Sequence, residues 1–568
     1  MKNIFSHKWI LPVVLVILVG LNWAATAWHA RIDLTEEKRF TLSKSTRDLL
    51  KQVKEPLHID VFLKGNYPSG FRKLSATSEE ILNEFKEIAG PNLTYSFLSP
   101  DETVPGSETS YGDSLSALGL YPINLTSQVE QGQQQQYVYP VALLHYKEKT
   151  EPVLLYKGKT PLINYTELNS AEALLEYNLG SAISRLVTEK KPVVAYSNGN
   201  GEPVDYRTYD LIENVLKTDY QLFTYSLAAP GPIPQDFKTL MIVKPSRPFT
   251  DIMKLKMDQY LMQGGNILLF VDRLNAEMDS LQIKNEVIAF DRDLQLNDLL
   301  FKYGVRVNAD LVMDLQCDFL PFDVNGNGQF ELLPWNYFPV LEGYGTSPIV
   351  KNMGFVAGRF VNSIDTVLAE GIKKTILLSS SVNSRTLATP ALISGRENVN
   401  APEDAKYNKK QIPVAVMLEG VFTSYFRNRL SQEMSDSLNA SGSIFRDKSN
   451  GNGKLIVVSD GDIPLNSVIK GGQQPIPMGM NPYTFGTQRE FPFANKEFIQ
   501  NCLEAMVNSG GLAEAKSKDY VVRMLDPKKI KENKTAWQVL NIAGPVLLVG
   551  ILSVIFYFLR RRKYSRPF

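Results

Sequence analysis

Histidine is the residue type that most limits the chemistry open to this chain. Among 568 residues there are only four histidines, at positions His7, His29, His58 and His145. The long C-terminal part therefore has no Ser-His-Asp triad, Cys-His pair or histidine metal site of its own. His58 and His145 fall in segments with strand-like alternation, where a hydrogen-bonded structural role is favoured over a ligand role.

One segment resembles the end of a phosphate-binding loop. Residues Lys157–Thr160 contain Gly-Lys-Thr, but Val153 stands where such a loop requires its first glycine. The chain is therefore not expected to bind ATP in this way, and no cofactor is predicted.

Two acidic segments contain oxygen ligands of the kind that cations prefer. Asp323–Gly328 begins like an EF-hand loop, yet Pro334 takes the position of the bidentate carboxylate, so a tight Asn-Gly turn is favoured over calcium. Asp460 and Asp462 follow an apolar strand, but the sequence near them shows no third ligand. A metal site there stays a minor alternative.

A polar loop at residues 198–202 is the candidate for ligand or partner contact. It comprises Asn198, Gly199, Asn200, Gly201 and Glu202, and lies between a predicted strand at Pro192–Tyr196 and a predicted helix at Asp205–Leu216. Ligand loops of α/β sheets occupy this position, at the carboxyl edge. The alternative is a plain turn, because the pattern is not Gly-x-Gly-x-x-Gly.

The elements that would position these residues form two α/β domains. In residues 31–165, a strand at Leu57–Leu63, a helix at Phe71–Ile88 and a strand at Leu93–Leu98 predict a βαβ unit. Further strands follow, with the polar tract Glu130–Gln136 interpreted as an exposed hairpin tip. This order predicts a thioredoxin-like α/β fold, without the Cys-x-x-Cys motif of redox catalysis.

A helix across residues 166–190 connects this domain to a larger one at residues 191–515. Strands and helices alternate there, which predicts a Rossmann-like or flavodoxin-like parallel sheet. Insertions are expected near residues 316–346 and 435–453. Within the first, Trp335, Tyr337 and Phe338 form a candidate partner surface, and the alternative is a hairpin that packs on its own domain.

The composition excludes several classes of protein. Lys and Arg total 61 against 60 Asp and Glu, a net charge of +1, so no basic field is available to hold nucleic acid. The only two cysteines, Cys317 and Cys502, exclude a disulfide framework and a four-cysteine zinc site. Whether these two pair stays open.

Two apolar runs at the ends predict membrane helices, within residues 1–30 and 538–560. The first, Ile10–Ala27, follows Lys2 and Lys8; a cleaved signal peptide is the alternative, since Ala25–Ala27 has the small-x-small form of a cleavage site. The second, Val539–Leu559, comes after a juxtamembrane linker at residues 516–537. It precedes a basic tail across residues 561–568, and the topology determinants there are Arg560, Arg561, Arg562 and Lys563.

These basic residues predict the orientation of the chain. By the positive-inside rule both termini lie in the cytoplasm of a two-pass protein of the inner, cytoplasmic membrane, with the bulk of the chain in the periplasm. The lysines at positions 528, 529, 531 and 534 oppose this orientation, but long domains translocate largely regardless of charge.

Several segments together resemble the GldG family of gliding-motility auxiliary proteins. They are residues 31–35, 40–43, 175–185, 198–202 and 263–272. The resemblance implies an extracytoplasmic, auxiliary or substrate-binding-like component of an ABC transporter, which works with a separate permease and ATPase in Bacteroidota. It implies no catalytic residues.

The expected function is therefore a non-enzymatic periplasmic auxiliary subunit of an ABC transporter linked to gliding motility. Its expected partners are the permease and ATPase subunits, the lipid bilayer, and other gliding or envelope machinery. One alternative is a solute-binding protein with a pocket between its two domains. A less favoured one is a membrane-anchored hydrolase that uses carboxylates such as Asp460 and Asp462.

Overall fold

The computed structural model separates the chain into two compact units, residues 1–519 and residues 520–568. The residues that the structure describes are 41–118, 122–129, 132–156, 165–188, 190–276, 286–323, 327–394, 404–440, 442–469, 473–487, 489–507, 513–516 and 534–564, with 16, 18–20, 120, 278 and 471. The predicted first membrane segment, residues 10–27, lies outside the described residues apart from positions 16 and 18–20.

The small domain has a four-stranded sheet in the order β2-β1-β5-β6. Strands β1 (Leu57–Val61) and β2 (Leu93–Phe97) are parallel and joined by helix α3 (Ser69–Ala89), which confirms the predicted βαβ unit. Strands β5 (Val141–Tyr146) and β6 (Lys149–Leu154) add antiparallel pairs. Helices α2 (Lys44–Leu50), α3 and α5 (Tyr165–Val187) contribute to one apolar core with the sheet.

The alternation of strand β1 decides which face of this sheet is buried. Leu57, Ile59 and Val61 are buried beneath the helices, while His58 and Asp60 point to the other face. Helix α4 (Tyr111–Ala117) contributes Leu115 to a small second cluster with Phe62 and Val141. That cluster covers one part of the second face and leaves the His58 end polar.

Strands β3 (Ile123–Val129) and β4 (Gly132–Val138) form a separate hairpin. The predicted hairpin at Glu130–Gln136 is confirmed, but its strands extend further than predicted, because the glutamines at positions 133–136 lie within β4 and pair with β3. Residues 130 and 131, between the strands, lie outside the described residues.

The large domain contains a ten-stranded sheet whose parallel part has the spatial order β8-β7-β9-β10-β22. These strands are β7 (Val193–Ser197), β8 (Gln221–Tyr225), β9 (Phe237–Val243), β10 (Asn266–Phe270) and β22 (Lys454–Val458). In chain order this is 2-1-3-4-5, the arrangement of flavodoxin-like doubly wound sheets. The order reverses between β7 and β9, where such sheets bind ligands.

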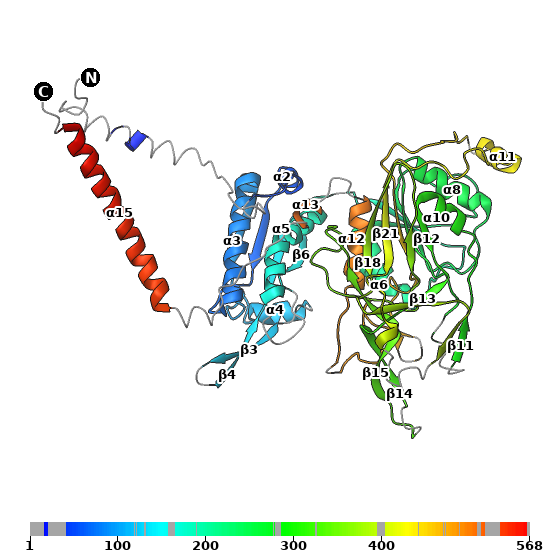
Figure 1. Ribbon diagram of the computed structural model, residues 1–568, viewed down its shortest axis with the longest axis horizontal. Helices are drawn as coiled ribbons and strands as arrows, with labels where there is room; N and C mark the ends of the chain where they lie inside the picture. The colour runs from blue at the N-terminus through cyan, green and yellow to red at the C-terminus, as the bar shows by residue number, and fades with distance from the viewer. Residues whose placement is uncertain are drawn as a thin grey trace. The chain divides into compact units, whose positions relative to one another are not determined.

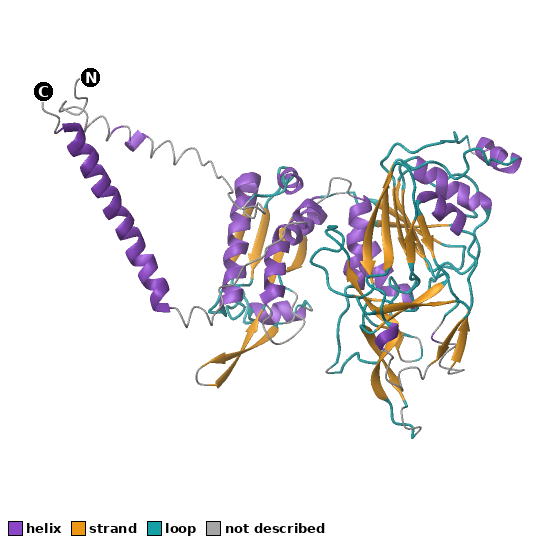
Figure 2. Cartoon of the chain, viewed as in Figure 1, coloured by secondary structure: helices purple, strands orange, loops and turns teal. Residues whose placement is uncertain are grey.

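Both faces of strands β7, β9, β10 and β22 are covered, as their largely apolar sequences require, whereas the edge strand β8 is half-exposed. On one face pack α12 (Asn495–Val507) and the helical segment of η3 (Tyr206–Thr208), α6 (Tyr209–Leu211), the π-helix η4 (Ile212–Leu216) and α7 (Lys217–Asp219). On the other pack α8 (Asp251–Met262) and α10 (Asn297–Tyr303). Figure 1 shows α12 and α8 on opposite sides of the strands, and Figure 2 shows the strand layer between helices.

Antiparallel strands extend the sheet beyond β22 through β21 (Pro413–Gly420), β18 (Ile372–Ser379), β15 (Glu331–Gly343) and β14 (Cys317–Phe322), and β16 (Val356–Ala357) pairs with β15. The sequence predicts late strands at Thr375–Leu378, Pro413–Leu418 and Lys454–Val458 that extend the sheet, and β18, β21 and β22 confirm them. Residues 316–346 contribute strands to this same sheet.

The prediction of a partner surface at Trp335, Tyr337 and Phe338 is wrong. All three side chains are buried, and Trp335 has an exposed fraction of 0%. Trp335 packs against Phe338 at a ring-centroid distance of 4.9 Å and against Phe360 at 5.7 Å. Large aromatic side chains gain most from leaving water together, so this segment forms the core of its own part of the domain.

The remaining elements pair locally around the large domain. They are β11 (Glu286–Ala289) with β20 (Ala391–Ser394), β12 (Val305–Val307) with β17 (Ile364–Thr366), β13 (Asp310–Asp314) with β19 (Ser384–Ala388), and β23 (Val468–Ile469) with β24 (Gln474–Pro475). The 3-10 turn η6 (Asp404–Lys406) and helix α11 (Gln432–Ala440) also belong to the large domain, while the 3-10 turn η2 (Gly90–Asn92) lies between α3 and β2 of the small domain. Cys317 and Cys502 are free thiols.

The second unit contains one long apolar helix, α15 (Lys534–Tyr564). Its residues Gln538–Arg562 are long and apolar enough to cross a membrane, and it is the one such helix among the residues that the structure describes. This helix indicates membrane anchoring at the C-terminal end. It contains the predicted determinants Arg560 to Lys563 in its last turns.

A candidate site at the carboxyl edge of the parallel sheet

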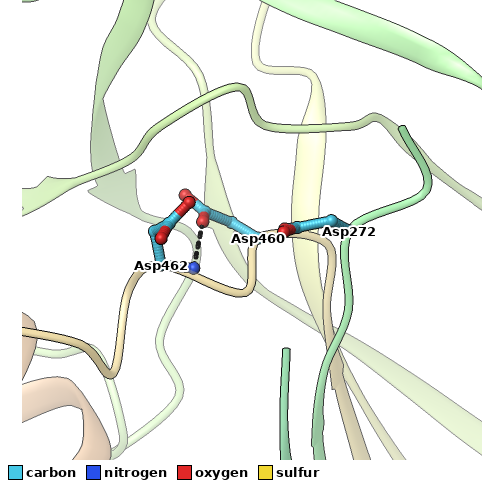
Figure 3. A group of neighbouring side chains, drawn as sticks. All are labelled: Asp272, Asp460 and Asp462. Atoms are coloured by element: carbon cyan, nitrogen blue, oxygen red, sulfur yellow. Dashed lines mark hydrogen bonds between the residues drawn. The ribbon is translucent and has the colours of Figure 1, made fainter. Parts of the chain in front are cut away.

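Four charged side chains meet where three neighbouring parallel strands end. Lys244 directly follows β9, Asp272 follows β10, and Asp460 and Asp462 follow β22. Because the strands are parallel and adjacent, their carboxyl ends lie at the same edge of the sheet. Figure 3 shows the three carboxylates facing one another across this edge.

Lys244 is the cation of this cluster. Its Nζ lies 2.7 Å from each carboxylate oxygen of Asp462 and 3.4 Å from Oδ2 of Asp272. The backbone of Lys244 has a φ of 45°, in the left-handed region that side chains other than glycine rarely occupy. Residues held in this region concentrate at functional sites, where the surrounding contacts offset the strain.

Backbone amides bind the other carboxylate oxygens. Gly461 N–H donates to Oδ1 of Asp272 at 2.6 Å. The two oxygens of Asp460 accept from the backbone N–H groups of Asp462 and Arg359, both at 2.7 Å. The ligand atoms of the three carboxylates lie within 4.8 Å of one another, close enough for one cation, but every oxygen already has a donor or a cation partner. We therefore describe the cluster as a buried ion-pair network and assign no metal to it.

The surroundings shift the pKa values of the three carboxyl groups in different directions. Burial, and then the charges of Asp462 and Asp272, raise the pKa of Asp460 well above its ordinary value. Burial also raises the pKa of Asp272. Burial opposes ionisation of Asp462 as well, but the charges of Lys244 and Arg359 outweigh it and lower the pKa of that carboxyl. The arrangement therefore makes Asp460 the carboxyl group that holds a proton more readily, and Asp462 the one that ionises more readily.

A cavity of about 520 Å³ opens beside Asp462. Arg359, which also lines it, donates from Nη2 to Ser467 Oγ at 2.8 Å and stacks over the ring of Phe338 at 5.6 Å. Arg207 lines the same cavity and forms a bidentate ion pair with Asp205. The volume falls within the range of small-molecule pockets, and the lining combines charged groups with aromatic rings.

The predicted loop Asn198 to Glu202 does follow β7, but it is organised around its own carboxylate. Glu202 accepts hydrogen bonds from Ser197 Oγ at 2.7 Å, Gly199 N at 3.0 Å and Asn200 N at 2.7 Å. The carbonyl of Asn200 accepts from the backbone N–H groups of Ser246 and Arg247. Asn198 and Gly199 remain exposed. The cavity beside Asp462 is lined by residues just after this loop, Asp205–Arg207, and not by the loop.

A second cavity, of about 410 Å³, is lined by residues of both α/β domains. Beside it the Tyr177 hydroxyl on α5 donates to the Glu504 carboxylate on α12. Lys516, on the short helix α13 (Ala513–Lys516), lies 5.0 Å from the centre of the Tyr177 ring. Burial raises the pKa of Glu504. Most of the lining residues are polar or charged, with Tyr177 and Tyr220 as its aromatic members.

Lys244, Asp272 and Arg359 were not identified from the sequence. For Asp272 a signal was present, since this acid ends an apolar strand run in the same way as Asp460. If the charged residue after every buried strand had been considered, Lys244, Asp272 and Asp460 would have been placed at the same edge of the sheet. Arg359 follows no long strand and carried no such signal.

The fold and this site define a two-domain α/β protein with a C-terminal apolar helix. Residues 191–502, more than half of the chain, match the family described as an ABC-type uncharacterized transport system, and the chain belongs to this family. It is thus an auxiliary component of an ABC-type transport system, and membership implies association with the other components of such a system. Residues 36–145 match a domain of unknown function, DUF7088.

Individual relatives add little about function. An uncharacterized protein of Borreliella burgdorferi is 21% identical over 443 residues, which cover 77% of this chain and 82% of that protein. The mmIFT52 N-terminal domain aligns with 56% of this chain and 97% of its own, at 13% identity and a TM-score of 0.31. The structure of a putative ThuA-like protein from Parabacteroides merdae aligns with 60% of this chain and 94% of its own, at 10% identity and a TM-score of 0.27. Scores this low carry no functional inference.

Proposed function

We propose that this protein is a non-enzymatic, membrane-anchored auxiliary subunit that docks to a separate ABC permease and ATPase. The observation that carries the proposal is the family match across the large α/β domain. The ion-pair network supports a non-enzymatic role, because Asp460 is fully buried and its two oxygens already accept backbone hydrogen bonds.

Purification of the full-length chain in a mild detergent, with quantitative mass spectrometry of copurifying proteins, tests this role. A permease and an ATPase in stoichiometric amounts are expected. A matched variant keeps residues 1–533 and replaces α15 with an unrelated single membrane helix of equal length. Loss of the partners in this variant would assign docking to α15, and their retention would assign it to the rest of the chain. Recovery of neither partner with the unaltered chain would contradict the proposal.

The proposed topology places both termini in the cytoplasm and the two α/β domains in the periplasm of a two-pass protein. The basic end of α15 supports this orientation through the positive-inside rule. Membrane-impermeant thiol labelling checks it, with a single cysteine introduced at Asn198, which is exposed, or at Arg562 in a chain whose native Cys317 and Cys502 are replaced by serine. The reagent should label a cysteine at position 198 in intact cells whose outer membrane has been made permeable. It should label a cysteine at position 562 only after the cells are lysed.

The link to gliding motility is a further part of the proposal and rests on the resemblance to the GldG family. Disruption of the gene in its host should abolish surface movement, and the intact gene should restore it. Unchanged movement would remove this link and leave the transporter role in place.

Solute capture is the second candidate function, because two cavities, of about 410 and 520 Å³, are present within the compact unit of residues 1–519. Thermal-shift screening of the full-length protein against small molecules tests it. A true ligand of the cavity beside Asp462 should lose its effect in Arg359→Ala, while a ligand of the other cavity should lose it in Tyr177→Ala.

A further inference from the structure

The two histidines of the small domain converge on one carboxylate. His58 lies on β1 and His145 on β5, and the two are direct cross-strand partners in the antiparallel register. Asp60 lies two residues beyond His58, so its side chain is on the same face of the sheet. His58 Nε2 is 3.1 Å from Oδ1 of Asp60, and His145 Nε2 is 3.3 Å from Oδ2.

Both imidazole rings are held in place by a hydroxyl group on their other nitrogen. His58 Nδ1 is 2.7 Å from Thr94 Oγ1, and His145 Nδ1 is 3.0 Å from Thr150 Oγ1. Metal-binding histidines usually have such a partner, which fixes the orientation of the ring. A threonine hydroxyl donates or accepts equally well. With its proton on Nε2, each imidazole donates to Asp60 and accepts from threonine. With its proton on Nδ1, it donates to threonine, and its Nε2 lone pair then faces a carboxylate that has no proton to donate, an arrangement that suits a cation between them.

These groups are reachable from solvent. The exposed fractions are 44% for the His58 side chain, 38% for His145 and 18% for Asp60. They occupy the polar part of the sheet face, beyond the small apolar cluster that contains Phe62 and Leu115. Half-exposed polar groups add little to the stability of a fold, so a purely structural role does not account for their convergence.

We propose that His58, Asp60 and His145 bind a divalent transition-metal ion such as Zn²⁺. Two imidazole nitrogens and one carboxylate are ligands that this ion prefers, and solvent or a partner group would complete its coordination. On binding, each neutral imidazole moves its proton from Nε2 to Nδ1, the threonine becomes the acceptor, and the freed Nε2 lone pair bonds the metal. The three ligands are not preassembled: among the described residues, the three acidic or histidine ligand atoms that all lie within 4.8 Å of one another belong to Asp272, Asp460 and Asp462. Binding therefore requires the two imidazole rings to turn toward each other.

The test uses full-length protein in detergent, treated with a chelator and purified without a histidine tag. Titration with Zn²⁺ against a chromophoric competitor should show one ion per chain. His58→Gln and His145→Gln should each weaken the affinity at least about tenfold, because each removes one of the ligands. Electron paramagnetic resonance of the Cu²⁺ form should show coupling to two nitrogens in the unaltered chain and to one in either variant.

Two controls distinguish this site from other ligands in the chain. His7→Gln/His29→Gln removes the other two histidines, and Asp462→Asn alters the acidic cluster of the large domain. Both should keep the affinity unchanged. Circular dichroism confirms that the variants fold, which is expected because the substituted side chains of the small domain are half-exposed. Absence of stoichiometric Zn²⁺ binding, or its persistence in His58→Gln/His145→Gln, would overturn the proposal.

Discussion

Lys244 Nζ and the Asp462 carboxylate form a partly buried bidentate contact, with both N···O distances at 2.7 Å, between residues that lie 218 positions apart. The contact joins the ends of β9 and β22, which are separated in the sheet by β10. Strand β22 comes after the long segment of antiparallel strands in the sequence, and β9 comes before it. The ion pair therefore links the two parts of the parallel sheet that this segment separates along the chain.

Replacing Lys244 with methionine should lower the free energy of unfolding by about 3 to 5 kcal/mol. The substitution leaves Asp462 buried without its cation, and breaking one side of a buried pair costs about this much. Urea denaturation of the detergent-solubilised chain, followed by tryptophan fluorescence, measures the change.

The double variant Lys244→Met/Asp462→Leu is the matched control for that loss. Because it removes both charges, it should recover a large part of the stability that Lys244→Met loses. If the double variant were less stable than Lys244→Met by the full cost of Asp462→Leu alone, the two side chains would not be energetically coupled.

Asp460 should make the large domain less stable as the pH rises. Its pKa in the folded state is raised above the unfolded value, so the folded state binds more protons between these two pKa values. Stability is then fully present below the unfolded pKa, near 4, and falls as the pH increases toward the folded pKa. Asp460→Asn cannot ionise, so its unfolding free energy should decrease less with pH than that of the unaltered chain. Equal pH slopes would contradict the raised pKa of Asp460.

The sequence predicted the parallel strands well, because each of them is short, continuously apolar and bounded by polar turns. Strands β7, β9, β10 and β22 lie within two residues of the predicted ranges, which are Pro192–Tyr196, Thr239–Val243, Asn266–Val271 and Lys454–Val458. Such strands are buried on both faces, so local pattern and tertiary environment agree. Helices α3 and α5 were predicted for the same reason, from apolar residues at helical spacing.

The sequence did not show which side chains, distant along the chain, lie close together in the folded protein. Asp272 and Asp460 are 188 positions apart, and only the pairing of β10 with β22 brings them together. The aromatic segment around Trp335 was left between a partner surface and a hairpin that packs on its own domain for a related reason. Its bulky rings suit either a partner surface or a core, and the choice depends on β15 pairing with strands far along the chain. The sequence placed His58 and His145 on separate strands. That they are cross-strand partners follows only from the pairing of β1 with β5.

Trp335→Ala should destabilise the protein by about 3 to 5 kcal/mol, the usual cost of truncating a buried tryptophan. Phe330→Ala is the control, because Phe330 is 68% exposed and lies in the same part of the chain. Its effect should stay within about 0.5 kcal/mol. Thermal unfolding of the two variants in parallel measures both effects. Similar losses in the two variants would be inconsistent with a core position for Trp335 alone.

Gly201→Ala should cost about 1 to 2 kcal/mol of stability, from two separate causes. Gly201 has a φ of 82°, a left-handed conformation that is strained for alanine. An added Cβ would also lie 2.0 Å from Ser246 Oγ, too close unless the serine side chain rotates away. Adding Ser246→Ala should relieve the second cause and leave the first. Asn198→Ala, at an exposed position of the same loop, should change stability by less than about 0.5 kcal/mol. If Asn198→Ala nevertheless released the copurifying permease and ATPase while Gly201→Ala lost only stability, partner contact would be assigned to the exposed tip of the loop and backbone packing to its base.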